Sequence, residues 1–474
     1  GCYNIAFGYF AGYCLSSGGC NIFIGKQSGC KSTTGTFNIA IGEGAVSNCN
    51  LTGGNNIALG RNAGYFISGG GCNLFLGLQA GKYANSNDGI ALGREALAAS
   101  WGGAASSGND NIAIGCQAAY KMTSGNTNIT IGKSAGRCIT TGYQNIYLGQ
   151  NAGFGYSSAA TGFNNVAIGQ GAGYAICCAQ HSVFLGTEAG YCNKIGKRNV
   201  YIGCGAGRCR GESGGDDNVA LGHCALMGSS TPSSNTGSGN VSIGEGTGYT
   251  VTSGGQNVMI GYGAGKSLTT AGCNIFIGNC AGCTIATGAS NILMGNTAGR
   301  CMCGGASNNI AFGASAGSRL DGPTVSNNIL IGQNAGLGQG GGGNSVYVNI
   351  FIGRNAGKCV CDGANYNIAM GDDAGCAITT AGQNTLIGNY AGCHITTGTA
   401  NLFLGVRTGM AGTSITGSRN ILIGCRVLLP SASCNDYLGI GYCDNRWITG
   451  DGSFNVCLAG STIKAMASGG VFCA

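Results

Sequence analysis

The chain has little proline and little charge, and both shortages narrow the class of protein. Only three residues are proline and 8% are charged. Glycine does not recur at every third position and proline is nearly absent, which excludes a collagen triple helix. No run of 18 or more apolar residues occurs, so the sequence predicts no membrane span. Charge-poor, glycine-rich chains are often disordered, but a hydrophobic content of 43% is too high for that class.

Groups that carry chemistry are also scarce. The net charge of +7 is spread over 474 residues, which favours no nucleic-acid partner. The three histidines have no companion Ser/Asp pattern. The 16 acidic residues are scattered, and adjacent pairs such as Asp216-Asp217 and Asp372-Asp373 fit solvated turns better than the spaced carboxylates of a glycosidase. We therefore expect no catalytic site, no cofactor and no enzyme activity.

What the chain has in abundance is glycine, with 96 residues, arranged in a repeat. The unit is Asn-Ile-x-Ile-Gly-x-x-Ala-Gly, and its first residue is called the anchor below. There are 26 anchors, 23 of them Asn, and the commonest spacing is 17 residues. Fixed-period repeats of this kind indicate a stacked architecture. Representative anchors are Asn21, Asn38, Asn128, Asn145, Asn257, Asn274, Asn384 and Asn401.

Each position of the unit has a structural interpretation. Residues one and three after the anchor are apolar, as in Ile129 and Ile131, which is the alternation of a strand whose two side chains share a face. The glycine four after the anchor ends that strand. The pair Ala135-Gly136 supplies a small inward residue and a second corner. A second short strand follows, as in Cys138–Gly142, with an Ile or Leu eleven after the anchor.

One such unit, with about three inward apolar residues, is too thin to bury a core alone, so its copies must stack. We therefore predict an all-β fold, a parallel β-solenoid of about 26 short coils with a 17-residue period. At about 4.8 Å per coil this is a rod of roughly 120 Å. The recurring Asn is expected to form a ladder of side-chain hydrogen bonds between coils.

The repeat also suggests a division of the chain. Residues 1–424 are expected to form the repeat rod, and residues 425–474 the terminal repeats and a cap. Longer anchor spacings at 98–108, 227–239 and 337–348 predict polar loops that protrude from single coils, where binding contacts would lie.

Two segments carry a resemblance to known families. The phrase Asn-Ile-Ala-Ile-Gly, at 38–42 and 111–115, resembles the head repeats of YadA-like trimeric adhesins. That resemblance implies a left-handed parallel β-roll with three chains side by side. The segments 429–441, 445–450 and 454–456 look like the tail-fibre proteins of cyanophage-type viruses, in which such a segment closes the repeat array.

The resemblance implies a structural or attachment fibre at an extracellular location or on a virion surface. Its expected partners are copies of itself, as a trimer or a filament, and a cell-surface glycan or other receptor. Two other classes stay open. Recurring Thr-Thr pairs, as at Thr140 and Thr379, could form an ice-binding surface, and a clustered carboxylate groove would indicate a depolymerase. A surface-layer or filament-forming structural protein is a further alternative.

The 28 cysteines are an even and high number, which favours an oxidising location outside the cell. Cysteines at matching positions of successive coils would lie near 5 Å apart, within disulfide reach. The metal alternative, Cys280 and Cys283 with Cys301 and Cys303, has poor spacing for a zinc site, so we expect no metal. The candidate disulfide pairs are Cys192/Cys209, Cys376/Cys393 and Cys14/Cys30.

Basic residues recur nine positions after the anchor and should line one edge. This edge could meet anionic glycans, or it could simply be a charged edge that prevents aggregation. Tyrosines near the same place, such as Tyr65 and Tyr191, could stack on sugars or pack against other subunits. The basic residues are Lys82, Arg137, Arg208, Lys266, Arg300 and Lys358.

Overall fold

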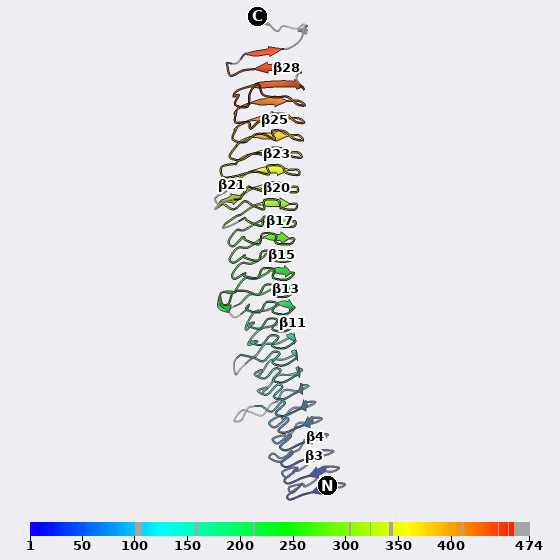
Figure 1. Ribbon diagram of the computed structural model, residues 1–474. Coiled ribbons are helices and arrows are strands. Elements are labelled where there is room, and N and C mark those ends of the chain that lie inside the picture. The colour runs from blue at the N-terminus through cyan, green and yellow to red at the C-terminus, as the bar shows by residue number, and fades with distance from the viewer. Residues whose placement is uncertain are drawn as a thin grey trace, which may run out of the picture. The chain divides into compact units, whose positions relative to one another are not determined.

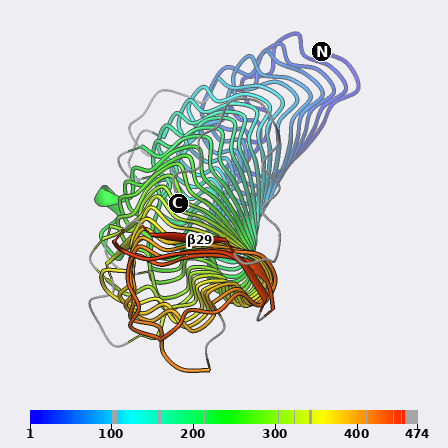
Figure 2. The same ribbon diagram turned by 90° about the horizontal axis from the view of Figure 1, so that it is seen from above.

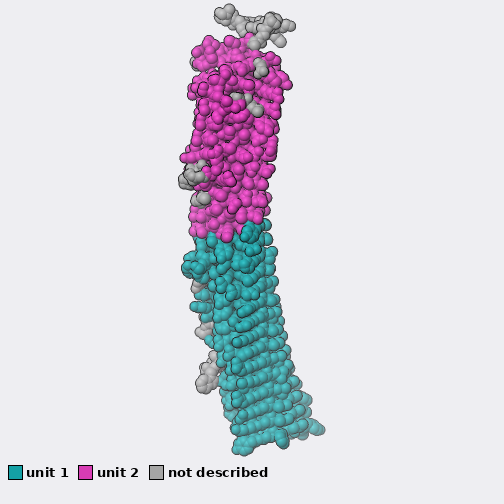
Figure 3. Space-filling view, in the orientation of Figure 1, with its two compact units in different colours: residues 1–262 teal, residues 263–474 magenta. Residues whose placement is uncertain are grey.

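The chain is an all-β protein, a parallel β-solenoid with a period of about 17 residues, as the sequence predicts. The computed structural model describes residues 1–99, 107–156, 160–211, 214–302, 305–322, 324–340, 345–409, 412–443, 445–453 and 455–458. The described helical structure is a single short 3₁₀ turn, Pro232–Ser234. The chain divides into two compact units, residues 1–262 and 263–474 (Figure 3).

Within the described part of unit 1, fifteen short strands pair in parallel, each with the next along the chain (Figure 1). Ile129 is aligned with Ile146, one coil later. Register survives the longer spacings, since Ile90 is aligned with Ile112 across a 22-residue step. The longer spacing therefore leaves the register of the strands unchanged. The strands are β1 (Ile5–Phe7), β2 (Ile22–Ile24), β3 (Ile39–Ile41), β4 (Ile57–Leu59), β5 (Leu74–Leu76), β6 (Ile90–Leu92), β7 (Ile112–Ile114), β8 (Ile129–Ile131), β9 (Ile146–Leu148), β10 (Val166–Ile168), β11 (Val183–Leu185), β12 (Val200–Ile202), β13 (Val219–Leu221), β14 (Val241–Ile243) and β15 (Val258–Ile260).

Unit 2 repeats the same coil and then changes direction. The last parallel strand is β27, and β28 and β29 pair antiparallel after it. The final anchor, Asn455, therefore precedes an antiparallel strand and starts no further solenoid coil. The strands are β16 (Ile275–Ile277), β17 (Ile292–Met294), β18 (Ile310–Phe312), β19 (Val325–Ser326), β20 (Ile329–Ile331), β21 (Val346–Tyr347), β22 (Ile350–Ile352), β23 (Ile368–Met370), β24 (Thr385–Ile387), β25 (Leu402–Leu404), β26 (Ile421–Ile423), β27 (Leu438–Tyr442), β28 (Asn445–Gly450) and β29 (Val456–Leu458).

The solenoid core lies on the side of the strand opposite to the two Ile rows. Except in β1 and β29, each three-residue strand alternates as expected, but its middle residue points inward and is buried, as Phe75 and Tyr147 are. The residues before and after it are half-buried or exposed. Further inward residues are the Ala seven after the anchor and an Ile or Leu eleven after it, as in Ala135 and Ile139.

An aromatic ring in the middle strand position is accommodated by a glycine eight after the anchor. Where an aromatic ring occupies the middle position, that residue is glycine, and a Cβ on Gly153 would lie 2.5 Å from the ring of Tyr147. Where the middle residue is Ala91, the corresponding residue is Leu97, which fills the space and is also buried. In other coils with Ala in the middle position, such as those of Ala58 and Ala167, the residue eight after the anchor is again glycine.

Glycine four after the anchor is needed because successive coils approach closely at the end of the strand. Gly132 has a φ of 132°, and a Cβ there would lie 2.5 Å from the carbonyl oxygen of Gly149. This corner repeats in coil after coil, and a view along the stack shows the coils of unit 1 tracing similar outlines (Figure 2). The sequence expectation of a close backbone approach at this glycine is confirmed.

The predicted second strand forms only isolated bridges or two-residue strands in the described residues. One bridge joins Ile139 to Ala160, and another joins Ile395 to Ile415. The backbone curves here, so that two N–H groups of one coil converge on one carbonyl of the next. The N–H groups of Thr33 and Gly35 both donate to Leu51 in this way, at 3.2 and 3.1 Å. A continuous ladder would need these N–H groups to reach separate carbonyls.

The anchor asparagines form buried rows of side-chain hydrogen bonds. Asn128 Oδ1 accepts hydrogen bonds from the backbone N–H and from Nδ2 of Asn145, at 3.1 and 3.0 Å. Asn128 Nδ2 donates to Asn111 Oδ1 and to the carbonyl of Gly142 in its own coil. Most other successive anchor asparagines make the same bonds, including Asn21 to Asn38, Asn240 to Asn257, Asn274 to Asn291, and Asn384 to Asn401.

Candidate interaction surfaces

The two Ile-rich rows of the strands form an apolar surface on the outside of the solenoid, called the outer apolar face below. It consists of the residues one and three after each anchor. In unit 1 every one of these residues is Ile, Val, Leu or Phe. Several are exposed, including Ile41 and Ile131 at 38% and Leu221 at 43%, and the others are half-buried.

The outer apolar face is long and carries no charge within unit 1. Fifteen coils at about 4.8 Å each extend it for about 65 Å along the stack. Monomeric proteins rarely expose contiguous apolar patches above a few hundred Å², and larger patches mark interaction sites. In unit 2 the corresponding rows are apolar at all positions but one, where Thr385 begins β24.

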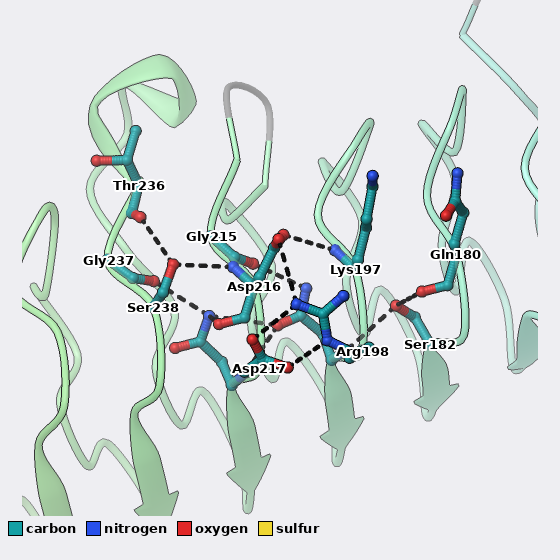
Figure 4. A network of polar contacts seen from close by, with 12 residues as sticks. Gln180, Ser182, Lys197, Arg198, Gly215, Asp216, Asp217, Thr236, Gly237 and Ser238 are labelled. Carbon is teal, nitrogen blue, oxygen red and sulfur yellow. Dashed lines mark hydrogen bonds and ion pairs between the residues drawn. The ribbon is translucent and has the colours of Figure 1, made fainter.

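The adjacent carboxylate pairs are engaged in ion pairs between coils. Arg198 Nε lies 2.6 Å from Asp217 Oδ1, and this hydrogen bond lowers the pKa of Asp217 (Figure 4). Asp216 accepts from the backbone N–H of Lys197 at 2.9 Å, and its own N–H donates to Ser238 Oγ at 3.0 Å. The pair therefore links three successive coils.

The second carboxylate pair has the same kind of partner. Arg354 Nη2 lies 2.7 Å from Asp372 Oδ2 and 3.5 Å from Asp373 Oδ2. Glu188 is bound by Arg208, with 2.6 Å between Oε2 and Nε. These described carboxylates pair with basic groups of neighbouring coils, and this arrangement stabilises the stack.

Aromatic residues nine after the anchor stack on one another along unit 1. Phe154 and Tyr174 have ring centroids 4.9 Å apart, and Tyr174 and Tyr191 are 4.7 Å apart, with nearly parallel planes. The guanidinium groups of Arg137 and Arg208 lie over the rings at the two ends of this row. Because neighbours cover the ring faces, these tyrosines present only their edges to solvent and cannot stack on a sugar.

A cavity opens on the surface where a coil has small side chains in place of aromatic ones. The ring of Tyr83 stacks on Phe66 of the preceding coil, 4.6 Å away, but the next coil has Ala98 and Ala99 where larger side chains would stand. Two adjoining cavities of about 340 and 210 Å³ share Lys82 and Tyr83. We call them the Lys82 cleft. Its other lining residues are Asn48, Asn62, Tyr65, Phe66, Gln79 and Tyr120.

The candidate cysteine pairs lie in adjacent coils. The N–H of Cys14 donates to the carbonyl of Cys30 at 2.9 Å, and the thiol of Cys376 approaches the carbonyl of Cys393 at 3.5 Å. No disulfide bond joins the cysteines that the structure describes. Burial raises the pKa of Cys376 to about 12. Of the four cysteines of the metal alternative, Cys303 lies outside the described residues.

The loop at 227–239 is described, whereas those at 98–108 and 337–348 lie partly outside the described residues. Under the described loop, Arg210 is fully buried eleven after its anchor, where other coils have Ile or Leu. Its guanidinium donates to the carbonyls of Val251, at 2.9 Å, and of Gly237. The basic residue therefore ties three coils together beneath the loop.

The paired threonines also serve the stack. The hydroxyl of Thr379 donates to the carbonyl of Thr396 at 2.9 Å, and that of Thr140 donates to Ala160 at 3.3 Å. These hydroxyls are therefore committed to neighbouring coils.

The described residues include no cluster of three or more potential metal ligands. Nor do they contain a helix with the length and hydrophobicity that a membrane crossing requires. Comparison with protein-family models and with curated proteins gives no match for the chain, so the candidate surfaces rest on its own geometry.

Proposed function

We propose that the protein is a structural and attachment protein, located outside the cell or on a virion surface, whose chains associate through the outer apolar face. The observation that carries this proposal is that two apolar rows, whose residues are half-buried or exposed, run without a polar interruption over the fifteen coils of unit 1. A face of this size is costly to leave in water, because each buried methylene stabilises an interface by about 0.8 kcal/mol.

A second copy of the same chain fits the outer apolar face best. Its side chains repeat once per coil, and only a partner with the same spacing can place a row of side chains between them along the whole length. The face has no charged residue in unit 1 that would call for a charged partner. Closed homo-oligomers commonly cover such faces, and the resemblance to trimeric adhesins favours three chains.

The association is tested by placing charges on the face. The double variant Leu148→Glu/Ile168→Glu alters the outward rows of β9 and β10 and leaves their buried residues in place. The control Gln150→Glu/Gln170→Glu adds the same charge to the same two coils, on exposed turn residues beside the face. We expect native mass spectrometry to show oligomers for the control and monomers for the face variant. Oligomers of equal mass for both variants would contradict the proposal.

The attachment role is assigned to the Lys82 cleft, with an acidic glycan as its ligand. Phe66 stacks on the Tyr83 ring, the Lys82 ammonium group lies 5.2 Å from the ring centroid, and Ala98 and Ala99 line the cavity on the next coil. Two coil steps span about 9.6 Å, which leaves room for one sugar ring beside Tyr83. Amide groups of Asn62 and Gln79 and the ammonium group of Lys82 supply polar contacts, and no carboxylate lines the cleft.

Glycan binding is tested by filling the gap. Ala99→Tyr should restore the stack and remove binding of an oligosaccharide of alternating glucuronate and N-acetylglucosamine, whereas Ser267→Tyr, at the same position of another coil, should not. Lys82→Gln should abolish the preference over a neutral N-acetylglucosamine tetramer, and Lys133→Gln should keep it. Calorimetry showing equal binding by wild type and Ala99→Tyr would exclude this cleft.

A further inference from the structure

Cys192 and Cys209 occupy the same position in the successive coils that follow β11 and β12. The N–H of Cys192 donates to the carbonyl of Arg208 at 2.8 Å, and the N–H of Cys209 donates to Met227 at 2.9 Å. The backbone N–H of each cysteine is therefore hydrogen-bonded to the next coil along the chain. A coil step of about 4.8 Å falls within the Cα separation of about 4.4–6.8 Å that a disulfide requires.

The surroundings of this pair favour a thiolate on Cys209. A hydrogen bond from the Cys192 thiol lowers the pKa of Cys209 to about 7, with a further contribution from the guanidinium of Arg208. Burial and the carboxylate of Glu188 oppose this shift. Glu188 is itself bound to Arg208 at 2.6 Å, so the favourable contribution of Arg208 is partly offset. Both thiols are partly exposed, which leaves them open to a small reagent.

Other stacked thiols have the opposite environment. Burial and the neighbouring Cys393 raise the pKa of Cys376 to about 12, and burial raises the pKa of Cys283 to about 11. The pKa of Cys30, in the pair with Cys14, is also raised by burial. Because the thiolate is the reactive form, these residues are poor nucleophiles at neutral pH.

We propose that Cys192 and Cys209 form a thiol–disulfide exchange site, which reacts with a small disulfide such as oxidised glutathione and closes a covalent bridge between two coils. The Cys209 thiolate attacks one sulfur of the reagent, forms a mixed disulfide and releases one thiolate. Cys192 then loses its proton to that thiolate and attacks the Cys209 sulfur, which expels the second. One reagent disulfide is reduced to one thiol and one thiolate, which takes a proton from water, and the two cysteines are oxidised to one disulfide.

The bridge would lie between two coils that have polar residues at an inward position. Eleven residues after the anchor these same two coils have Asn193 and Arg210 in place of the usual Ile or Leu, and both are fully buried. The side-chain amide of Asn193 has no hydrogen-bond partner within the described structure. A covalent link would stabilise this pair of coils by limiting the freedom of the unfolded chain between residues 192 and 209.

The experiment exposes the fully reduced chain to oxidised glutathione at pH 7, quenches it with N-ethylmaleimide, and maps non-reduced digests by mass spectrometry. We expect the link between Cys192 and Cys209 to form first. Its rate should exceed that of a thiol with an unshifted pKa by about five- to eightfold, because a larger thiolate fraction outweighs a weaker nucleophile. Formation of other links while Cys192 and Cys209 are recovered alkylated would overturn the proposal.

Two variants separate the roles within the pair. Cys192→Ser should stop the reaction at a glutathione adduct on Cys209. Arg208→Gln should move the midpoint of the rate–pH profile to higher pH, whereas Arg137→Gln, at the same position of the β8 coil, should leave it unchanged. If Arg208→Gln kept the wild-type melting temperature and the wild-type rate–pH profile, a contribution of Arg208 to the lowered pKa of Cys209 would be excluded. These outcomes are independent of chain association.

Discussion

At the residue scale, the fold depends on side chains that satisfy groups in two coils at once. Asn suits the anchor because its amide accepts from the next coil and donates both to the preceding coil and to its own. Ser182 occupies one anchor position, and its shorter side chain makes only some of these hydrogen bonds. Its Oγ still accepts from the N–H of Asn199, at 3.2 Å, but has no amide to bond the rest.

Replacing an anchor residue should lower the free energy of unfolding in proportion to the number of hydrogen bonds lost. Asn128→Ala leaves the N–H of Asn145 and the carbonyl of Gly142 buried without these partners, so we expect a loss of about 3 kcal/mol of unfolding free energy. Asn128→Ser should cost less, because a hydroxyl can accept from Asn145 as Ser182 does from Asn199. Chemical denaturation measures both variants. Equal stability of wild type and Asn128→Ala would contradict the role of the row.

The pairing of glycine with an aromatic ring gives a second prediction at this scale. Gly153→Ala adds strain from a φ of 54° and places a Cβ against the ring of Tyr147. Gly246→Ala adds the same kind of strain, at a φ of 62°, but its Cβ meets nothing within 4 Å. Gly153→Ala should therefore be about 1–3 kcal/mol less stable than Gly246→Ala in thermal unfolding. Equal losses of stability in the two variants would show that the ring of Tyr147 moves aside without an energetic cost.

At the element scale, the sequence predicts the strand and its register but not which side of it is buried. Alternation shows that Ile129 and Ile131 share a face, and it cannot assign that face to the core or to solvent. The deciding feature is the buried middle residue, which is accompanied by a glycine eight after the anchor wherever it is an aromatic ring, as in Tyr147 with Gly153. The second strand was over-predicted because Ile and Thr favour strands, whereas curvature of the backbone at that point prevents a ladder.

Ion pairs between coils, formed by residues such as Asp217 that precede an anchor, predict how the melting temperature depends on pH. The folded pKa of Asp217 is lowered by Arg198, so its stabilising contribution is present above the unfolded value of 3.8 and is lost as pH falls through the folded pKa. Asp217→Asn should lower the melting temperature slightly at neutral pH and reduce its fall below pH 4. Asp88→Asn, at the same position of the β6 coil, is the control. If the melting temperature of Asp217→Asn fell below pH 4 as steeply as that of the wild type, a contribution of this ion pair to stability would be excluded.

At the whole-molecule scale, the stacked fold and two of the candidate cysteine pairs, Cys192/Cys209 and Cys376/Cys393, could be located from spacing alone, because residues 17 apart overlie one another in coils of that length. The Lys82 cleft could have been found from Ala98 and Ala99, which interrupt the large side chains of neighbouring coils. The lowered pKa of Cys209 could not be found, since it depends on the orientation of Cys192 and Arg208. The outer apolar face became visible only when the buried side of the strand was known.

The central claim is that copies of this chain cover the outer apolar face of the solenoid. Sedimentation equilibrium of the full chain over a wide dilution series tests it most directly. We predict a discrete oligomer, with three chains favoured, that persists on dilution. A monomer at every concentration, with the face open to solvent, would contradict the account.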